Sequence, residues 1–129
     1  MSRLNLVFVY GTLKTGEDDH SIMDNLSAVL IGKGQLAENK YVIANCMGIP
    51  YLVEDQAQPQ FVKGEIYSIP TAKFKELDRF EKGYTRVLLP VYNSSGDKRE
   101  AYAYLCDFPE HIMSSSHCSL CYSYSNNQD

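Results

Sequence analysis

Residues 4–14 have the sequence LNLVFVYGTLK, in which an apolar stretch runs directly into a glycine. The β-branched and aromatic residues over residues 4–10 are typical of a buried strand, and Gly11 lets the backbone turn sharply after it. Such a turn collects several N–H groups in one concave place, which suits a carboxylate or carbonyl oxygen. Tyr10 and Thr12 add hydroxyls that can orient a small polar ligand. The same residues also fit an ordinary strand end, with Gly11 as a plain turn glycine and Lys14 in solvent.

The polar stretch after this loop leads into a short helix. Apolar residues recur at helical spacings over residues 20–30, and Asp19 is a candidate N-cap. Residues 31–67 then alternate short apolar stretches with glycines and prolines. This punctuation indicates several short strands joined by turns.

A second helix is expected after Pro70, with Thr71 as a candidate cap and Gly83 as a candidate stop. Two further strands, at residues 85–92 and 100–106, flank a run of turn-forming residues and predict a hairpin. A β-rich majority with two short helices indicates an α+β fold, built either as layers or as a barrel-like sheet.

The second helix carries several charged side chains toward its C-terminal end. Glu81 lies at the helical spacing of Phe74 and Leu77, which turns its carboxylate toward the apolar side. An inward carboxylate is costly unless it is paired or used, and partial burial raises its pKa into the range suited to acid/base catalysis. The alternative is a solvated helix face with exposed ion pairs worth about 0–1 kcal/mol each, formed by Glu76, Asp78, Arg79 and Glu81.

Length and composition limit the class of protein. The 129 residues fit one domain with its own core, and 44% hydrophobic and 22% charged residues are typical of a globular protein. The net charge of -4 comes without a basic stripe, so we expect no nucleic-acid partner. The N-terminal apolar stretch is too short for a signal peptide, and no apolar run reaches the roughly 18 residues of a membrane-spanning helix. We therefore expect a cytoplasmic protein with no membrane partner, and a monomer.

The cysteines and the C-terminal stretch give three further expectations. A chain without a secretory signal usually keeps its thiols reduced, so we expect no structural disulfide among the four cysteines. Cys118 and Cys121 form a single CxxC pair, which lacks the second ligand pair of a structural zinc site, so no metal is expected. Residues 114–129 are rich in serine, asparagine and tyrosine without apolar periodicity, which predicts a flexible tail.

Two motifs of the chain resemble the γ-glutamylcyclotransferase-like family. Residues 10–14 read YGTLK and residues 77–86 read LDRFEKGYTR, in the order found in that family. Within the family, the match is to the γ-glutamylamine cyclotransferase type. The resemblance covers about residues 5–107. Shorter similar stretches lie at residues 48–53, 62–67 and 103–105.

This resemblance implies a fold, a site and an activity. The fold is a compact, mixed, β-barrel-like sheet with flanking short helices over residues 1–110, followed by a serine-rich tail at residues 111–129. Glu81 is implied as the catalytic acid/base, and Lys82 departs from the glycine that commonly follows it, which affects the pocket rim or the leaving-group preference. No metal or other cofactor is implied. The implied substrate-binding residues are Tyr10, Gly11, Thr12, Leu13, Tyr84, Arg86 and Tyr104.

A γ-glutamyl amide can react with itself, because its α-amine can reach its own γ-carbonyl and close a five-membered ring. The resemblance implies cleavage of small γ-glutamyl amines, such as γ-glutamyl-ε-lysine, to 5-oxoproline and the free amine. On this hypothesis Glu81 moves the proton, and the N–H groups of residues 11–13 hold the glutamyl group. Two alternatives stay open: γ-glutamyl amino acids as substrates, and a noncatalytic binding module on the same fold.

Overall fold

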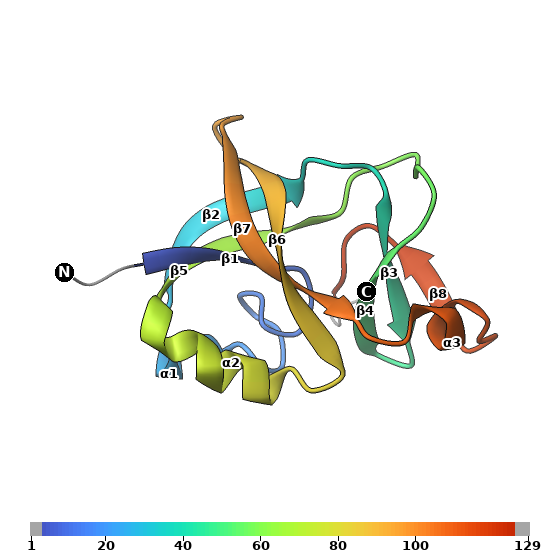
Figure 1. Cartoon of the computed structure of the whole chain (residues 1–129), viewed down its shortest axis with the longest axis horizontal. Helices are drawn as coiled ribbons and strands as arrows, with labels where there is room; N and C mark the ends of the chain where they lie inside the picture. Colours follow the sequence, from blue (N-terminus) through green and yellow to red (C-terminus); the bar gives the residue numbers. More distant parts are fainter. Residues whose placement is uncertain (1–3, 126–129) are drawn as a thin grey trace.

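The computed structural model of the chain describes residues 4–125 as a mixed sheet with a few short helices, as predicted (Figure 1). The helices are α1 (Ser21–Asn25), α2 (Phe74–Phe80) and α3 (Pro109–Met113), with a 3₁₀ turn at Thr71–Lys73 directly before α2. The strands are β1 (Leu4–Val9), β2 (Val29–Leu36), β3 (Tyr41–Cys46), β4 (Ile49–Glu54), β5 (Lys63–Pro70), β6 (Tyr84–Asn93), β7 (Lys98–Cys106) and β8 (Cys118–Cys121).

The strands pair in the order β1-β5-β2-β6-β7-β4-β3-β8, and β1 also pairs with β7 through Val7 and Tyr102. Because β7 pairs back with β1, the five strands at the start of this order close on themselves and form a barrel-like arrangement. Strand β4 joins the same edge of β7 as β1, nearer the C-terminal end of β7, through Leu52 and Leu105, and β3 and β8 extend the sheet from β4 (Figure 1). The parallel pairs are β1 with β7 and β4 with β7, and the other pairings are antiparallel.

Alternate residues of β1 belong to two different cores. Phe8 lies in the core enclosed by the barrel-like strands, whereas Val7 and Val9 pack with residues of the helices such as Met23 and Leu77. This two-residue period is what a strand with both faces covered requires. Each fully buried apolar side chain of this size contributes about 2 kcal/mol through burial. Both cores converge on the residues that follow β1.

The first helix is shorter than the sequence predicts. It ends at Asn25, and Ser27 has a φ of 58°, which stops the helical path. Val29 and Leu30 belong to β2, where pairing with β5 overrides their helical spacing. The Asp19 cap is also wrong, because the N-cap position is His20 and no side chain caps the helix.

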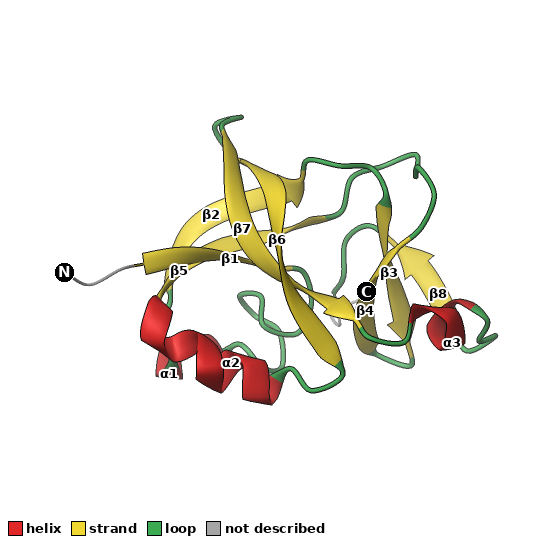
Figure 2. Cartoon of the chain, in the orientation of Figure 1, coloured by secondary structure: helices red, strands yellow, loops and turns green. Residues whose placement is uncertain are grey.

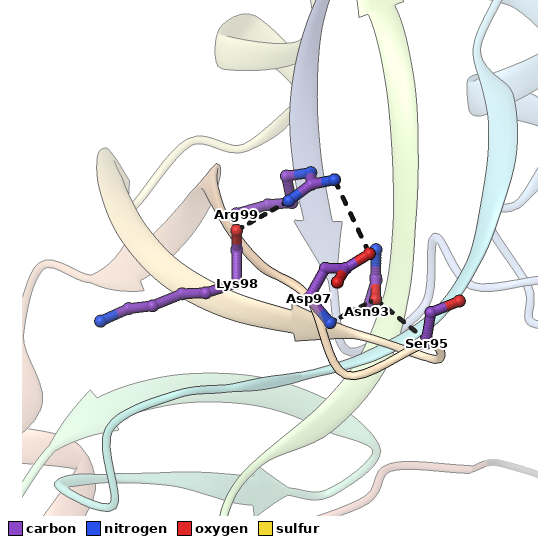
Figure 3. A network of polar contacts seen from close by, with 5 residues as sticks. All are labelled: Asn93, Ser95, Asp97, Lys98 and Arg99. Carbon is purple, nitrogen blue, oxygen red and sulfur yellow. Dashed lines mark hydrogen bonds and ion pairs between the residues drawn. The ribbon is translucent and has the colours of Figure 1, made fainter.

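The second helix and the hairpin agree with the sequence. Leu77 is fully buried, and α2 ends before Gly83 as expected. Thr71 does not cap this helix; its hydroxyl oxygen instead accepts a hydrogen bond from the Asn5 amide at 2.9 Å. Strands β6 and β7 form the predicted hairpin around a polar turn at residues 93–97 (Figures 2 and 3).

The described part of the C-terminal stretch is ordered, which corrects the predicted flexible tail at residues 111–129. Strand β8 pairs with β3 and so extends the same sheet past residue 110. Tyr124 is 1% exposed in the main core, and its hydroxyl donates to the Gly48 carbonyl at 2.6 Å. Residues 126–129 of the predicted tail lie outside the described residues.

The prediction of no disulfide is also wrong. Cys46 ends β3 and Cys118 begins β8, and these two residues face each other in the antiparallel register and are bonded through their sulfurs. The pairing joins residues 72 positions apart, so nothing local in the sequence announces it. Because Cys118 is bonded to Cys46, it does not form a ligand pair with Cys121. Cys121 has a free thiol.

Candidate active site

A cavity of about 220 Å³ opens where the loop after β1, the turn between β3 and β4, and the C-terminal end of α2 come together. It contains Glu81 and all but one of the residues predicted to bind substrate. The residues that line it are Phe8, Val9, Tyr10, Gly11, Thr12, Leu13, Asp19, Gly48, Ile49, Pro50, Phe80, Glu81, Tyr84 and Tyr104.

The loop after β1 uses its carbonyl groups internally and leaves its N–H groups open. The carbonyl of Gly11 accepts from the Lys14 N–H at 3.1 Å, and that of Thr12 accepts from the Asp19 N–H at 2.9 Å. The carbonyl of Leu13 accepts from His20 Nδ1 at 3.0 Å, so that nitrogen carries the proton. Within residues 4–125, the N–H groups of residues 11–13 have no hydrogen-bond acceptor. Because residues 11–13 line the cavity, these N–H groups are available to a ligand there.

Gly11 is required by close packing. A Cβ atom at this position would lie 2.5 Å from Cγ of Pro50, which is buried at the start of β4. The glycine thus lets the loop lie directly against the β3–β4 turn. The loop after β1 and the start of β4, which both line the cavity, are therefore in contact at this point.

Glu81 is the residue at the C-terminal cap of α2, with its N–H donating to the Leu77 carbonyl at 3.0 Å. Its side chain lines the cavity, as the spacing of the helix predicts. Burial, and to a smaller extent the negative charge of Asp19, raises the pKa of Glu81 from 4.5 to about 7. A carboxyl group with this pKa both accepts and returns a proton near neutrality.

Three tyrosines line the cavity, and their hydroxyls bind protein groups. Tyr10 donates to the Tyr104 carbonyl at 2.7 Å and accepts from the Leu52 N–H at 3.2 Å. Tyr84 donates to the Pro50 carbonyl at 2.8 Å. Burial raises the pKa of all three hydroxyls, so they stay protonated as donors. Tyr10, predicted to orient a ligand with its hydroxyl, uses that hydroxyl to join β4 and β7.

Arg86 lies outside the described residues that line the cavity. Its Nε is 3.1 Å from Oδ1 of Asp78, and its guanidinium stacks over the rings of Phe74 and Tyr102 at 4.4 and 4.8 Å. The same Asp78 oxygen accepts from the Tyr104 hydroxyl at 2.7 Å. Arg86 therefore reaches the site indirectly, through Asp78 and Tyr104.

The acidic and apolar parts of the cavity wall are not predicted by the sequence. Asp19, expected only as a helix cap, lines the cavity together with Glu81. Gly48, the first two residues of β4 and Phe80 form much of the remaining wall. The acidic run that ends at Asp19 was the available signal, but its position opposite Glu81 depends on how the loop folds back.

Two other kinds of feature are absent from residues 4–125. No group of three or more histidine, cysteine or acidic side chains has the geometry to hold a metal ion. No helix there has the length and apolar character needed to cross a membrane.

Comparison with known proteins gives consistent matches over this part of the chain. The family described as "Gamma-glutamyl cyclotransferase, AIG2-like" matches residues 7–120. The "Gamma-glutamylaminecyclotransferase" of Rattus norvegicus is 38% identical over 92 residues, which cover 66% of this chain and 62% of the relative. The protein of the same name from Homo sapiens is 36% identical, over 67% of this chain and 61% of the relative. The chain thus spans about three fifths of the length of these two relatives.

A solved structure agrees over almost the whole chain. The crystal structure of an AIG2-like protein from Mus musculus superposes with a TM-score of 0.82 at 27% sequence identity. The match covers 98% of this chain and 91% of the mouse chain. It therefore includes the strands on both sides of the cavity.

Proposed function

The chain belongs to the gamma-glutamyl cyclotransferase, AIG2-like family, and from this premise we propose that it cleaves γ-glutamyl amines to 5-oxoproline and the free amine. One observation carries the proposal. Glu81 lies in a cavity walled by open backbone donors, and its pKa is raised from 4.5 to about 7. That combination provides a proton acceptor next to a binding site for a polar acyl group.

The reaction needs a proton to be moved from one nitrogen to another. The substrate's α-ammonium gives a proton to the Glu81 carboxylate, and the freed amine attacks the γ-carbonyl carbon. As the bond between that carbon and the leaving nitrogen breaks, Glu81 returns the proton to the leaving amine. The ring nitrogen then gives up its second proton, which the departing amine takes up to leave as an ammonium ion. The products are 5-oxoproline and the amine, and no water is consumed.

The loop after β1 would hold the substrate in its ring-closing shape. The open N–H groups of Gly11, Thr12 and Leu13 are suited to an oxygen of the glutamyl group, either its carboxylate or its γ-carbonyl. Holding the amine against the γ-carbonyl supplies much of the rate, because well-oriented intramolecular reactions reach effective molarities of about 10⁵ M or more. Tyr84 and Tyr104 line the space around the reacting atoms, and Asp78 with Arg86 fixes Tyr104.

The rim of the cavity favours an alkyl amine as leaving group. Ile49 and Phe80 line the cavity and are 52% and 42% exposed, so they offer apolar surface at its mouth. The hydrocarbon chain of an amine such as the lysine side chain would pack there. Lys82 is exposed beside Glu81, and it would favour the second candidate class, γ-glutamyl amino acids, through their free carboxylate.

The test is release of 5-oxoproline from γ-glutamyl-ε-lysine and from a γ-glutamyl amino acid. Glu81→Gln keeps the shape of the side chain but removes the base, so we expect kcat to fall by about 10³-fold or more. Glu76→Gln, an exposed position on the same helix, is the matched control and should leave kcat unchanged. Thermal melting of each variant shows whether it is folded.

The outcomes separate the remaining alternatives. Preference for γ-glutamyl-ε-lysine supports the amine type, and preference for the γ-glutamyl amino acid supports the second class. If the unaltered protein binds γ-glutamyl compounds but forms no 5-oxoproline from either, the noncatalytic binding module is the better description. Equal activity of Glu81→Gln and unaltered protein would rule out Glu81 as the acid/base.

A further inference from the structure

The cavity contains two carboxylates and no cationic side chain. Asp19 and Glu81 both line it, whereas no lysine, arginine or histidine of the described residues does. The ion pairs within residues 4–125 join other acidic residues to lysine or arginine, and neither Asp19 nor Glu81 takes part in one. Uncompensated negative charge in a partly buried space is costly. A cavity of this kind attracts a cationic group of a ligand.

The other pole of the same cavity consists of donors. The open N–H groups of residues 11–13 bring partial positive charge to the wall. A ligand that carries both a cationic and an anionic or carbonyl group would match both poles. The glutamyl end of a γ-glutamyl amide has this pattern, with an α-ammonium, an α-carboxylate and a γ-carbonyl.

The backbone of Asp19 is fixed on both sides. Its N–H donates to the Thr12 carbonyl at 2.9 Å, and its own carbonyl accepts from the Ile22 N–H at 3.0 Å. The first bond ties Asp19 directly to the donor loop, so the two poles are held relative to each other. Asp19 is thus placed as a fixed part of the cavity wall, between the donor loop and α1.

We propose that Asp19 binds the α-ammonium of the γ-glutamyl group and thereby selects substrates whose α-amine is free. The inference rests on the proposed cyclisation and assigns the two carboxylates different tasks. Asp19 holds the nitrogen in reach, and Glu81 takes the proton from it. An N-acylated γ-glutamyl compound has no cation for Asp19 and would bind weakly.

The experiment uses γ-glutamyl-n-butylamide and its deamino analogue, 5-(butylamino)-5-oxopentanoate, which lacks only the α-ammonium. Dissociation constants are measured by calorimetry in the Glu81→Gln background, where turnover does not interfere. Adding Asp19→Asn should weaken binding of the γ-glutamyl amide about tenfold or more, because a charge-assisted hydrogen bond is lost. Binding of the deamino analogue should change less than about twofold. Asp19→Glu should restore part of the loss, and Asp24→Asn, an exposed position on α1, should have no effect.

Steady-state kinetics of the single variant Asp19→Asn provide an independent readout. We expect KM for γ-glutamyl-n-butylamide to rise about tenfold, with a smaller change in kcat. The midpoint of the rising limb of kcat/KM against pH should also move to lower pH, because the Asp19 charge contributes to the raised pKa of Glu81. A residue that only supports the loop would weaken both ligands alike and leave this midpoint in place.

The outcomes distinguish this inference from the proposed function. Equal weakening of both ligands by Asp19→Asn would overturn the role of Asp19, even if the unaltered protein releases 5-oxoproline. If Asp19→Asn weakens binding of the γ-glutamyl amide alone and the unaltered protein shows no turnover, the ammonium site is supported and the proposed cyclisation is overturned. Failure of both ligands to bind the folded Glu81→Gln protein would overturn both.

Discussion

The turn at residues 93–97 lies in solvent, the loop at residues 10–13 lines the cavity, and the two differ in how their N–H groups are used. In the turn, Oδ1 of Asn93 accepts from the N–H groups of Ser95 and Asp97 at 3.0 and 2.9 Å (Figure 3). The Gly96 N–H donates to the Asn93 carbonyl at 3.0 Å. In the cavity loop, the carbonyls are bonded but the N–H groups of residues 11–13 have no acceptor within the described residues.

This difference separates a turn built for stability from a loop built for binding. In a turn whose N–H groups are all bonded within the turn, the local hydrogen bonds contribute fully to the stability of the folded protein. In a partly enclosed loop whose N–H groups have no acceptor, this contribution is missing until a ligand supplies the acceptors. The unpaired carboxylate of Glu81 adds to the same cost. Substitutions that remove the binding or catalytic groups of the cavity should therefore increase the free energy of unfolding.

The largest expected effect is a pH-dependent stabilisation by Glu81→Gln. The folded pKa of Glu81 is about 7 and the unfolded value is near 4.5, so the folded state favours the protonated form. Its contribution to stability is fully present below pH 4.5 and is lost as pH rises through 7. The variant should match the unaltered protein at low pH and exceed its free energy of unfolding by roughly 3 kcal/mol at about pH 8.

Urea unfolding of both proteins at several pH values measures this difference. Glu76→Gln on the same helix is the control, because Glu76 is exposed and, within residues 4–125, is paired only with Lys73 at 3.8 Å. Its effect should stay below about 1 kcal/mol at every pH. A constant gap between Glu81→Gln and the unaltered protein across the range would show that Glu81 does not titrate as described.

A smaller effect, on activity, is expected from Gly11→Ala. The new Cβ would lie 2.5 Å from Cγ of Pro50, so the loop or the β3–β4 turn must move. A shift of about 1 Å in the donor N–H groups should lower kcat/KM about 100-fold. The matched variant is Gly96→Ala in the solvent turn, where φ is +83° and a Cβ would meet no described atom within 4 Å apart from its chain neighbours. It should cost about 1 kcal/mol of stability and leave kcat/KM unchanged.

These two glycine variants test the comparison directly. Melting curves and 5-oxoproline release are measured for both. If Gly11→Ala keeps full kcat/KM while remaining folded, the N–H groups of the loop do not bind the reacting group. If Gly96→Ala lowers kcat/KM, the two regions are coupled and the contrast between them fails.

The sequence alone predicts the parts of the site that depend on local pattern. Strand β1 and the glycine turn follow from the β-branched and aromatic residues at positions 7–10 and from Gly11. The position of Glu81 follows from the helical spacing of Phe74 and Leu77, which are 3% and 0% exposed in the structure. Periodicity determines which face of an element is buried, so it also determines which wall a charged residue reaches.

The parts that were missed depend on contacts between distant segments. Leu30 has helical spacing but pairs with Tyr67 in the sheet, and Asp19 reaches the cavity because its N–H bonds back to Thr12. Strand β8 lacks a strong strand pattern, and it forms because β3 provides a free edge and Cys46 faces Cys118. Serine-rich composition predicts disorder only where no such edge is available.

The smallest effect is expected from Asn93→Ala in the solvent turn. The change removes one carbonyl oxygen that accepts two backbone N–H groups, but both of these are exposed and water replaces the lost acceptor. The free energy of unfolding should fall by about 1 kcal/mol, and kcat/KM should not change, because residues 93–97 do not line the cavity. Urea unfolding and 5-oxoproline release measure the two quantities on one preparation. Asn39→Ala, at an exposed position outside the turn, controls for the loss of an amide. A loss of more than about 3 kcal/mol would mean that the stability of the whole hairpin depends on this turn, and not only the hydrogen bonds within it.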